Sequence, residues 1–191
     1  MWYLLHELVA DVHCGHNVRA TVFIETRAMY RPDGPVELRP VGEVEFVQGL
    51  AAASASGLLG GLTRVGLYGH CDDEVLTTWR RGRAAVAACP NVSLKLGGIG
   101  MPRLGFDWHE RTTPIGSDEL ATAMAPLMTY CIAQFGPDQC MFESNFPPDK
   151  VSFSHHILFN AFKRLSTGYS AAERAALFHD TAVRAYRISA V

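Results

Sequence analysis

Polar and charged side chains stand at the ends of segments whose composition is otherwise that of buried strands. Side chains in a strand alternate between two faces, so Lys95 shares a face with Gly97, and Glu143 shares one with Asn145. A carboxylate there can take a proton from water, and an ammonium or imidazole group can stabilise negative charge developing on an oxygen. The candidate catalytic residues are Glu25, His70, Glu143 and Asn145, and the candidate substrate-binding residues are Lys95, Gly97 and Trp108.

The carboxylates also have a structural interpretation, in which their charges serve the fold. Glu143 would form an ion pair with Lys95 inside the sheet, and Glu25 would pair with an arginine. Asn145 carries an amide, which cannot act as a general base. Its functional role would be to orient a substrate by hydrogen bonding.

His70 and Trp108 also have structural interpretations. His70 would hydrogen-bond locally to Asp72 or Asp73. Trp108 lies in a polar loop at 102–116, where it would be either part of a lid over the site or a packing anchor. Both interpretations stay open at the level of sequence.

Four short apolar segments predict strands, at residues 19–25, 64–69, 92–96 and 140–146. Segments with helical spacing lie between and around them, at 2–14, 42–55, 75–88, 117–135, 151–166 and 170–187. Ser117 is expected to cap its helix, and Ser170 with Glu173 has the pattern of a capping box. Strands that alternate with helix-length crossovers predict an α/β fold with about four parallel strands and flanking helices.

Composition narrows the class of protein. Apolar residues make up 48% and charged residues 19% of the chain, as in a globular protein. A formal net charge of −2 provides no attraction to nucleic acid or to an anionic membrane, so neither is expected as a partner. The five cysteines are not closely paired, which favours a reducing compartment and a cytoplasmic location. The N-terminus does not have the pattern of a signal peptide, and no apolar run is long enough to cross a bilayer.

Three blocks of sequence resemble the amidohydrolase-related family, which includes pyrone-dicarboxylate lactonase and sugar lactonases. They are GHNVRATVFIE with the downstream MYRPDGPVELRPVGEVEFV, then CPNVSLKLGGIGMP, and finally FGPDQCMFESNFPPDK with the tail ALFHDTAVRAYRI. The resemblance implies a metal-dependent hydrolase fold of the (β/α)₈, or TIM-barrel, type over residues 1–191. It implies that activated water attacks a lactone or a similar cyclic ester or amide.

The chain also departs from the family pattern. A complete barrel takes roughly 250 residues, whereas this chain has 191. The His-x-His pair of the family's first strand is absent, and Asn145 stands where many members place a metal-binding or proton-accepting aspartate. We therefore expect a truncated barrel that retains the family's second, third, seventh and eighth strands. We also expect no cofactor here, although zinc or manganese would be present in full-length relatives.

Two functional alternatives follow from these departures. One is a hydrolase whose partner is a small-molecule substrate. The other is a catalytically inactive half-barrel with a structural or oligomerisation role. A barrel without its middle strands exposes sheet edges and apolar helix faces, which favour association between chains. We therefore expect a homo-oligomer or a marginally stable chain.

Overall fold

The computed structural model describes residues 5–19, 21, 29–36, 39, 41–43, 45–46, 73–88 and 92–188. The chain divides into two compact units, residues 1–63 with Val191 and residues 64–190. In the first unit, helix α1 spans Leu5–Val12, inside the helix predicted at 2–14. Residues 41–43 and 45–46 are also helical. The expectation of a single domain over 1–191 stays a prediction.

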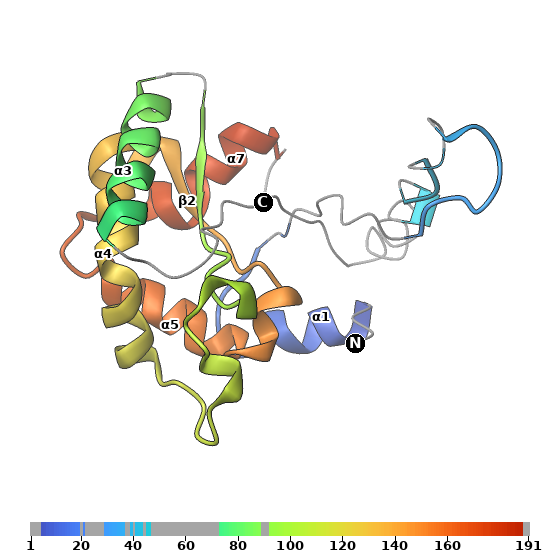
Figure 1. Ribbon diagram of the computed structural model, residues 1–191, viewed down its shortest axis with the longest axis horizontal. Helices are drawn as coiled ribbons and strands as arrows, with labels where there is room; N and C mark the ends of the chain where they lie inside the picture. The colour runs from blue at the N-terminus through green and yellow to red at the C-terminus, as the bar shows by residue number, and fades with distance from the viewer. Residues whose placement is uncertain are drawn as a thin grey trace. The chain divides into compact units, whose positions relative to one another are not determined.

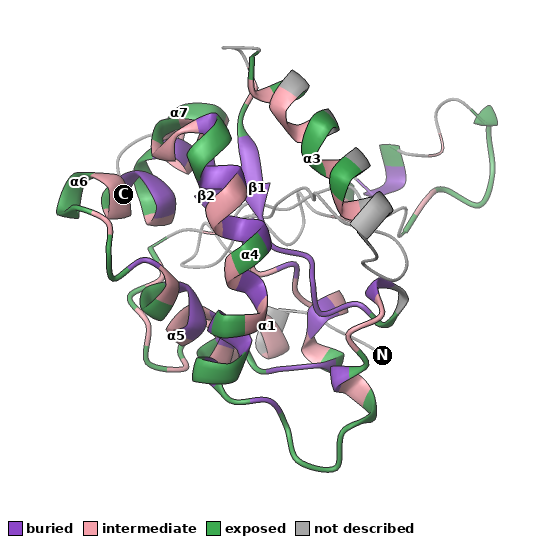
Figure 2. Ribbon diagram, turned by 60° about the vertical axis from the view of Figure 1, so that its left-hand side comes forward, coloured by how far each residue is buried: buried purple, intermediate pink, exposed green. Residues whose placement is uncertain are grey.

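A parallel βαβ arrangement lies at the centre of the second unit (Figure 1). Strand β1 (Leu94–Leu96) is followed by helix α4 (Ser117–Phe135) and then by strand β2 (Cys140–Phe142). The two strands pair in parallel with Lys95 opposite Met141. A parallel pair requires a crossover of a dozen or more residues, and α4 supplies it. Every residue of both strands is buried, as Figure 2 shows.

Helices surround this pair of strands. Helix α3 (Asp73–Ala87) and helix α5 (His155–Leu165) both pack against α4. The C-terminal segment consists of α6 (Ala171–Ala175), a π-helical turn at Ala176–Asp180 and α7 (Thr181–Tyr186), and the last two contact β2. Short 3₁₀ turns lie at Pro102–Leu104, Trp108–Glu110, Pro137–Gln139 and Pro148–Val151. None of the described helices is long and apolar enough to cross a membrane.

The hydrophobic core lies on one face of the strand pair. Leu94, Leu96, Cys140 and Phe142 all belong to it, and they alternate with Lys95 on β1 and with Met141 and Glu143 at β2. Phe142 stacks on Phe162 of α5, with ring centroids 4.4 Å apart. Burial raises the pKa of the Cys140 thiol to about 12, so this cysteine stays protonated and serves as an apolar core residue.

The predicted α/β fold with parallel strands is confirmed, and its elements differ in detail. The strands predicted at 92–96 and 140–146 are shorter than their apolar runs. The strand predicted at 64–69 and nearly all of that at 19–25 lie outside the described residues, as does most of the helix predicted at 42–55.

The helix caps were predicted with mixed success. The capping box of Ser170 and Glu173 is present, and its hydrogen bonds lower the pKa of the Glu173 carboxyl. The prediction for Ser117 was wrong, because Gly116 occupies the cap position of α4 without a side-chain hydrogen bond. The Ser117 hydroxyl instead accepts a hydrogen bond from Arg164 Nε of α5, at 3.1 Å.

Candidate functional site

A buried ion pair joins the C-terminal ends of β1 and β2. Lys95 Nζ lies 2.7 Å from Glu143 Oε2, and the two side chains are 6% and 1% exposed. The Glu143 amide donates to the carbonyl oxygen of Leu96 at 3.1 Å, so the parallel pairing continues one residue past β2. The ion pair proposed from the sequence as the structural interpretation of Glu143 is therefore present. Such a pair can hold a carboxylate and an ammonium group charged although both side chains are buried.

Gly97 makes room for this pair. A Cβ atom at position 97 would lie 2.4 Å from Glu143 Cγ and 2.4 Å from the Glu143 carbonyl oxygen. The first residue after β1 therefore has to be glycine for Glu143 to approach. Gly97 is buried next to Glu143, and it contributes to the site by having no side chain, which leaves space for Glu143.

Asn145 is held by Asp149, a residue that sequence reasoning missed. The Asn145 backbone is left-handed, with φ 50°, and its Nδ2 donates to Asp149 Oδ1. The other carboxylate oxygen, Oδ2, accepts from the backbone N–H of Gly100 at 2.9 Å. Asp149 is 0% exposed and Asn145 is 9% exposed. The only sequence signal for this contact is an acidic residue four positions after the asparagine, in a proline-rich turn.

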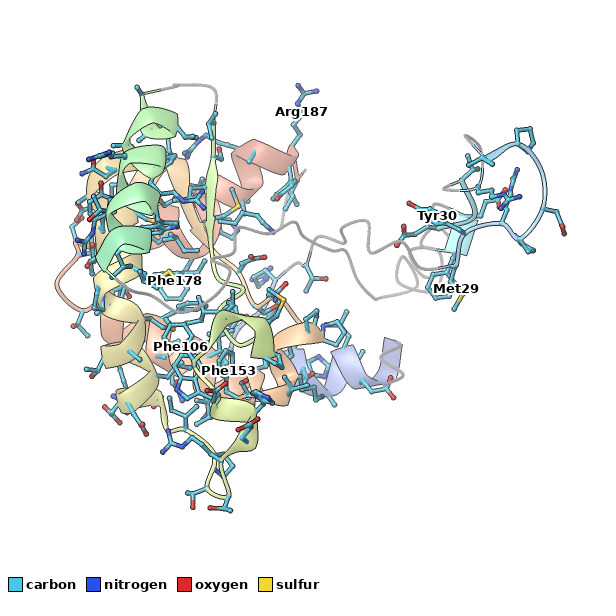
Figure 3. All side chains as sticks on the ribbon, viewed as in Figure 1. Met29, Tyr30, Phe106, Phe153, Phe178 and Arg187 are labelled. Atoms are coloured by element: carbon cyan, nitrogen blue, oxygen red, sulfur yellow. The ribbon has the colours of Figure 1, made fainter. Side chains whose placement is uncertain are left out.

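Trp108 lies in the core. It is 8% exposed and stacks on Phe106 with ring centroids 4.4 Å apart and an interplanar angle of 10°. On another side it is tilted against Phe153 at 6.0 Å; Figure 3 labels both phenylalanines. This placement agrees with the packing interpretation of Trp108, and Phe106 is the half-buried member of the stack.

Two candidates, Glu25 and His70, lie outside the described residues, and so does Asp72, one of the expected partners of His70. Their roles stay predictions. Among the described candidates, Lys95, Gly97 and Glu143 come together at the two strand ends. Asn145 lies two residues after Glu143 and contacts Asp149.

The described groups at these strand ends do not suit a divalent metal ion. Zinc in proteins takes three or four ligands from cysteine, histidine and carboxylate side chains. Here the Glu143 carboxylate already contacts an ammonium group, whose positive charge opposes a bound cation. The Asn145 amide is a neutral group, and its Nδ2 is hydrogen-bonded to Asp149.

We expect the strand ends to retain no stoichiometric zinc or manganese after dialysis, because the ammonium group of Lys95 places a positive charge against the carboxylate that would bind the ion. Elemental analysis of the dialysed protein measures this, with the final dialysis buffer as the blank. Metal that survives dialysis in a one-to-one ratio would contradict this expectation and would direct attention to His70 and Glu143.

Comparison with known proteins identifies the family. A family model described as amidohydrolase matches residues 60–188, more than half of the chain, and this stretch contains both strands and all the described site residues. The chain belongs to the amidohydrolase family. The family resemblance is thereby confirmed, and the second and third of the three sequence blocks lie within the matched stretch.

Individual relatives agree with this assignment. The chain is 38% identical over 110 residues to the uncharacterized protein y4mH of Sinorhizobium fredii, a match that covers 58% of this chain and 33% of that protein. It is 31% identical over 120 residues to L-fucono-1,5-lactonase of Burkholderia multivorans, covering 61% and 38% respectively. The chain thus spans about a third of the length of these relatives.

Comparison with solved structures indicates the type of fold. An amidohydrolase from Burkholderia multivorans with bound HEPES is similar at 29% identity and a TM-score of 0.53, covering 61% of this chain and 39% of that one. A structure with bound zinc is similar at 28% identity and a TM-score of 0.52, with the same coverage. The likeness identifies the strands and helices of the second unit as a partial α/β barrel of the amidohydrolase type.

Proposed function

We propose that this amidohydrolase-family chain hydrolyses a lactone, or a similar cyclic ester or amide, by means of an activated water. The observation that carries the proposal is the buried contact between Lys95 and Glu143 at the C-terminal ends of adjacent parallel strands. Active sites of βα-barrel enzymes lie at this end of the strands. The 31% identity to a protein named L-fucono-1,5-lactonase supports a lactone as the substrate class.

The two charged groups have complementary roles in the proposed reaction. Glu143 takes a proton from water as the water oxygen bonds to the carbonyl carbon of the lactone. Lys95 stabilises the negative charge that develops on the carbonyl oxygen. The ring C–O bond then breaks, and Glu143 returns the proton to the departing ring oxygen. The product is the open-chain hydroxy acid, and no proton is gained or lost by the enzyme.

The remaining candidates complete this proposed site. Gly97 allows Glu143 to approach β1, and Trp108 supports the half-buried Phe106 ring, an apolar surface of the kind against which a sugar ring packs. Glu25 and His70 are proposed as a further carboxylate and imidazole at the ends of the other two predicted strands.

The test measures hydrolysis of L-fucono-1,5-lactone and D-glucono-1,5-lactone, corrected for their spontaneous hydrolysis. The Glu143→Gln variant should lose about 100-fold or more in kcat, the usual contribution of a general base. The matched control is Glu119→Gln, because Glu119 also makes a 2.7 Å ion pair, with Arg111, but on the surface. The control should retain its activity.

Two outcomes would count against the proposal in different ways. If the wild-type chain hydrolyses neither lactone faster than buffer does, the inactive half-barrel alternative is favoured. If the wild type is active and Glu143→Gln is equally active, the base is another residue. The expected self-association of the chain is independent of both outcomes and stays a prediction.

A further inference from the structure

We infer that Asp149 is a positioning residue, which determines which end of the Asn145 amide faces the strand ends that carry the Lys95–Glu143 pair. The consequence for catalysis rests on the proposed hydrolase function. The orientation of the amide does not. The two claims are therefore separable by experiment.

The orientation follows from the chemistry of the contact. Both oxygens of Asp149 accept hydrogen bonds, Oδ1 from Asn145 Nδ2 and Oδ2 from the Gly100 N–H. Two donors aimed at one carboxyl group match an ionised carboxylate, which has only acceptors. The NH₂ end of the Asn145 amide therefore has to face Asp149. Its carbonyl oxygen, at the other end of the planar amide, then points away from Asp149.

The backbone limits any rearrangement. Asn145 is in the left-handed region, and the N–H of Asp149 donates to the Asn145 carbonyl oxygen at 3.1 Å. Asparagine is among the few side-chain-bearing residues that adopt this conformation readily. The two residues are thus joined through main chain and side chain at once.

The same carboxylate also holds the loop after β1. Besides the Gly100 N–H bond to Asp149, the Ser152 hydroxyl donates to the Gly100 carbonyl oxygen. A Cβ atom at Gly100 would lie 2.9 Å from Asp149 Cβ, so the loop and the aspartate are in close contact. Asp149 therefore sets the geometry between the loops that follow β1 and β2. In the proposed reaction, the Asn145 oxygen accepts a hydrogen bond from the substrate or the attacking water.

The Asp149→Asn substitution separates orientation from packing. Asparagine has the same size and can still accept from the Gly100 N–H through its oxygen. Its NH₂ group then faces residue 145, so the Asn145 amide has to turn over and present its oxygen to position 149. A purely structural Asp149 would tolerate this change, whereas a positioning Asp149 would not.

Nitrogen-15 NMR of the asparagine side chains reads the orientation without any substrate. The wild-type chain has four asparagines, Asn17, Asn91, Asn145 and Asn160, so the spectrum is simple. The Asn145 NH₂ should exchange with solvent more slowly than that of the exposed Asn17, and this protection should be lost in Asp149→Asn. Exchange as fast as that of Asn17 in the wild type, or an unchanged Asn145 signal in the variant, overturns the inference. The wild-type measurement decides the matter if the variant does not fold.

Kinetics with the same two lactones test the consequence. Asp149→Asn should lower kcat about tenfold or more with a smaller change in KM. In the double variant Asn145→Asp/Asp149→Asn, one carboxylate oxygen at position 145 accepts from the amide at position 149. The other oxygen faces the site, as the Asn145 oxygen does in the wild type, so the double variant should recover part of kcat. A turned amide without any loss of kcat overturns the positioning role. A wild type that hydrolyses neither lactone counts against the proposed function and favours the inactive alternative, while the NMR result still decides the orientation.

Discussion

The Lys95→Met variant should lose about 3–5 kcal/mol of unfolding free energy, because it leaves the Glu143 carboxylate buried without its counter-ion. Lys95 and Glu143 are 6% and 1% exposed, so solvent cannot compensate for the missing ammonium group. Methionine keeps most of the length and apolar volume of the lysine stem. The effect is therefore one of charge rather than of packing. Urea unfolding followed by circular dichroism measures it.

A second substitution distinguishes the loss of the ion pair itself from the cost of leaving one buried charge without a counter-ion. In Lys95→Met/Glu143→Leu neither charge remains, and replacing a buried ion pair by apolar groups is often neutral or stabilising. We expect the double variant to recover most of the stability that Lys95→Met loses. Removing the exposed Arg111–Glu119 pair with Arg111→Met should change the urea midpoint little. Equal midpoints for wild type and Lys95→Met would show that the pair is not buried as described.

The Gly97→Ala variant should lose about 3 kcal/mol or more, at or above the upper end of the usual cost of overpacking. The new Cβ would lie 2.4 Å from Glu143 Cγ and from the Glu143 carbonyl oxygen. A backbone oxygen cannot rotate out of the way as the end of a long side chain can. The two strand ends would have to separate, and the Lys95–Glu143 contact would lengthen with them.

Gly168→Ala is the matched control for this substitution, because a Cβ atom at Gly168 would have no atom within 4 Å and the backbone there is not left-handed. The control should unfold at nearly the wild-type urea concentration. In an active chain, Gly97→Ala should also lower kcat through the displaced Glu143. Indistinguishable midpoints for the two alanine variants would contradict the close approach of Glu143 to Gly97.

Strand alternation was the part of the site that sequence could predict well. It identified Lys95 and Glu143 as an ion pair that would form once the two strands are neighbours, and this pair is present. Asn145, which alternation grouped with Glu143, lies beyond the end of β2 in the left-handed region. The lengths of the strands were less predictable. An apolar run records burial, whereas a strand ends where its hydrogen-bonding partner ends, and β2 stops at Phe142 shortly before the left-handed Asn145.

Asp149 could not be predicted in this way. It lies in a turn, where no periodicity relates one side chain to the next, and its partner Gly100 is 49 residues away in the chain. Ser117 illustrates the same limit on a smaller scale, because a serine at the start of a helix is a cap only if the preceding residue leaves that position to it. In both cases the hydrogen-bonding partner comes from a distant part of the chain, so the local sequence does not predict it.

The alternation of the two strands has a consequence for how this protein can vary among species. Even-numbered positions such as Leu94, Leu96 and Phe142 belong to the hydrophobic core, where another apolar residue of similar volume is tolerated. The odd-numbered Lys95 and Glu143 carry paired charge, so a change at one demands a matching change at the other. Natural variation should therefore be independent at the even positions and correlated between these two odd ones. A one-residue insertion in either strand would exchange the two sets and disrupt both.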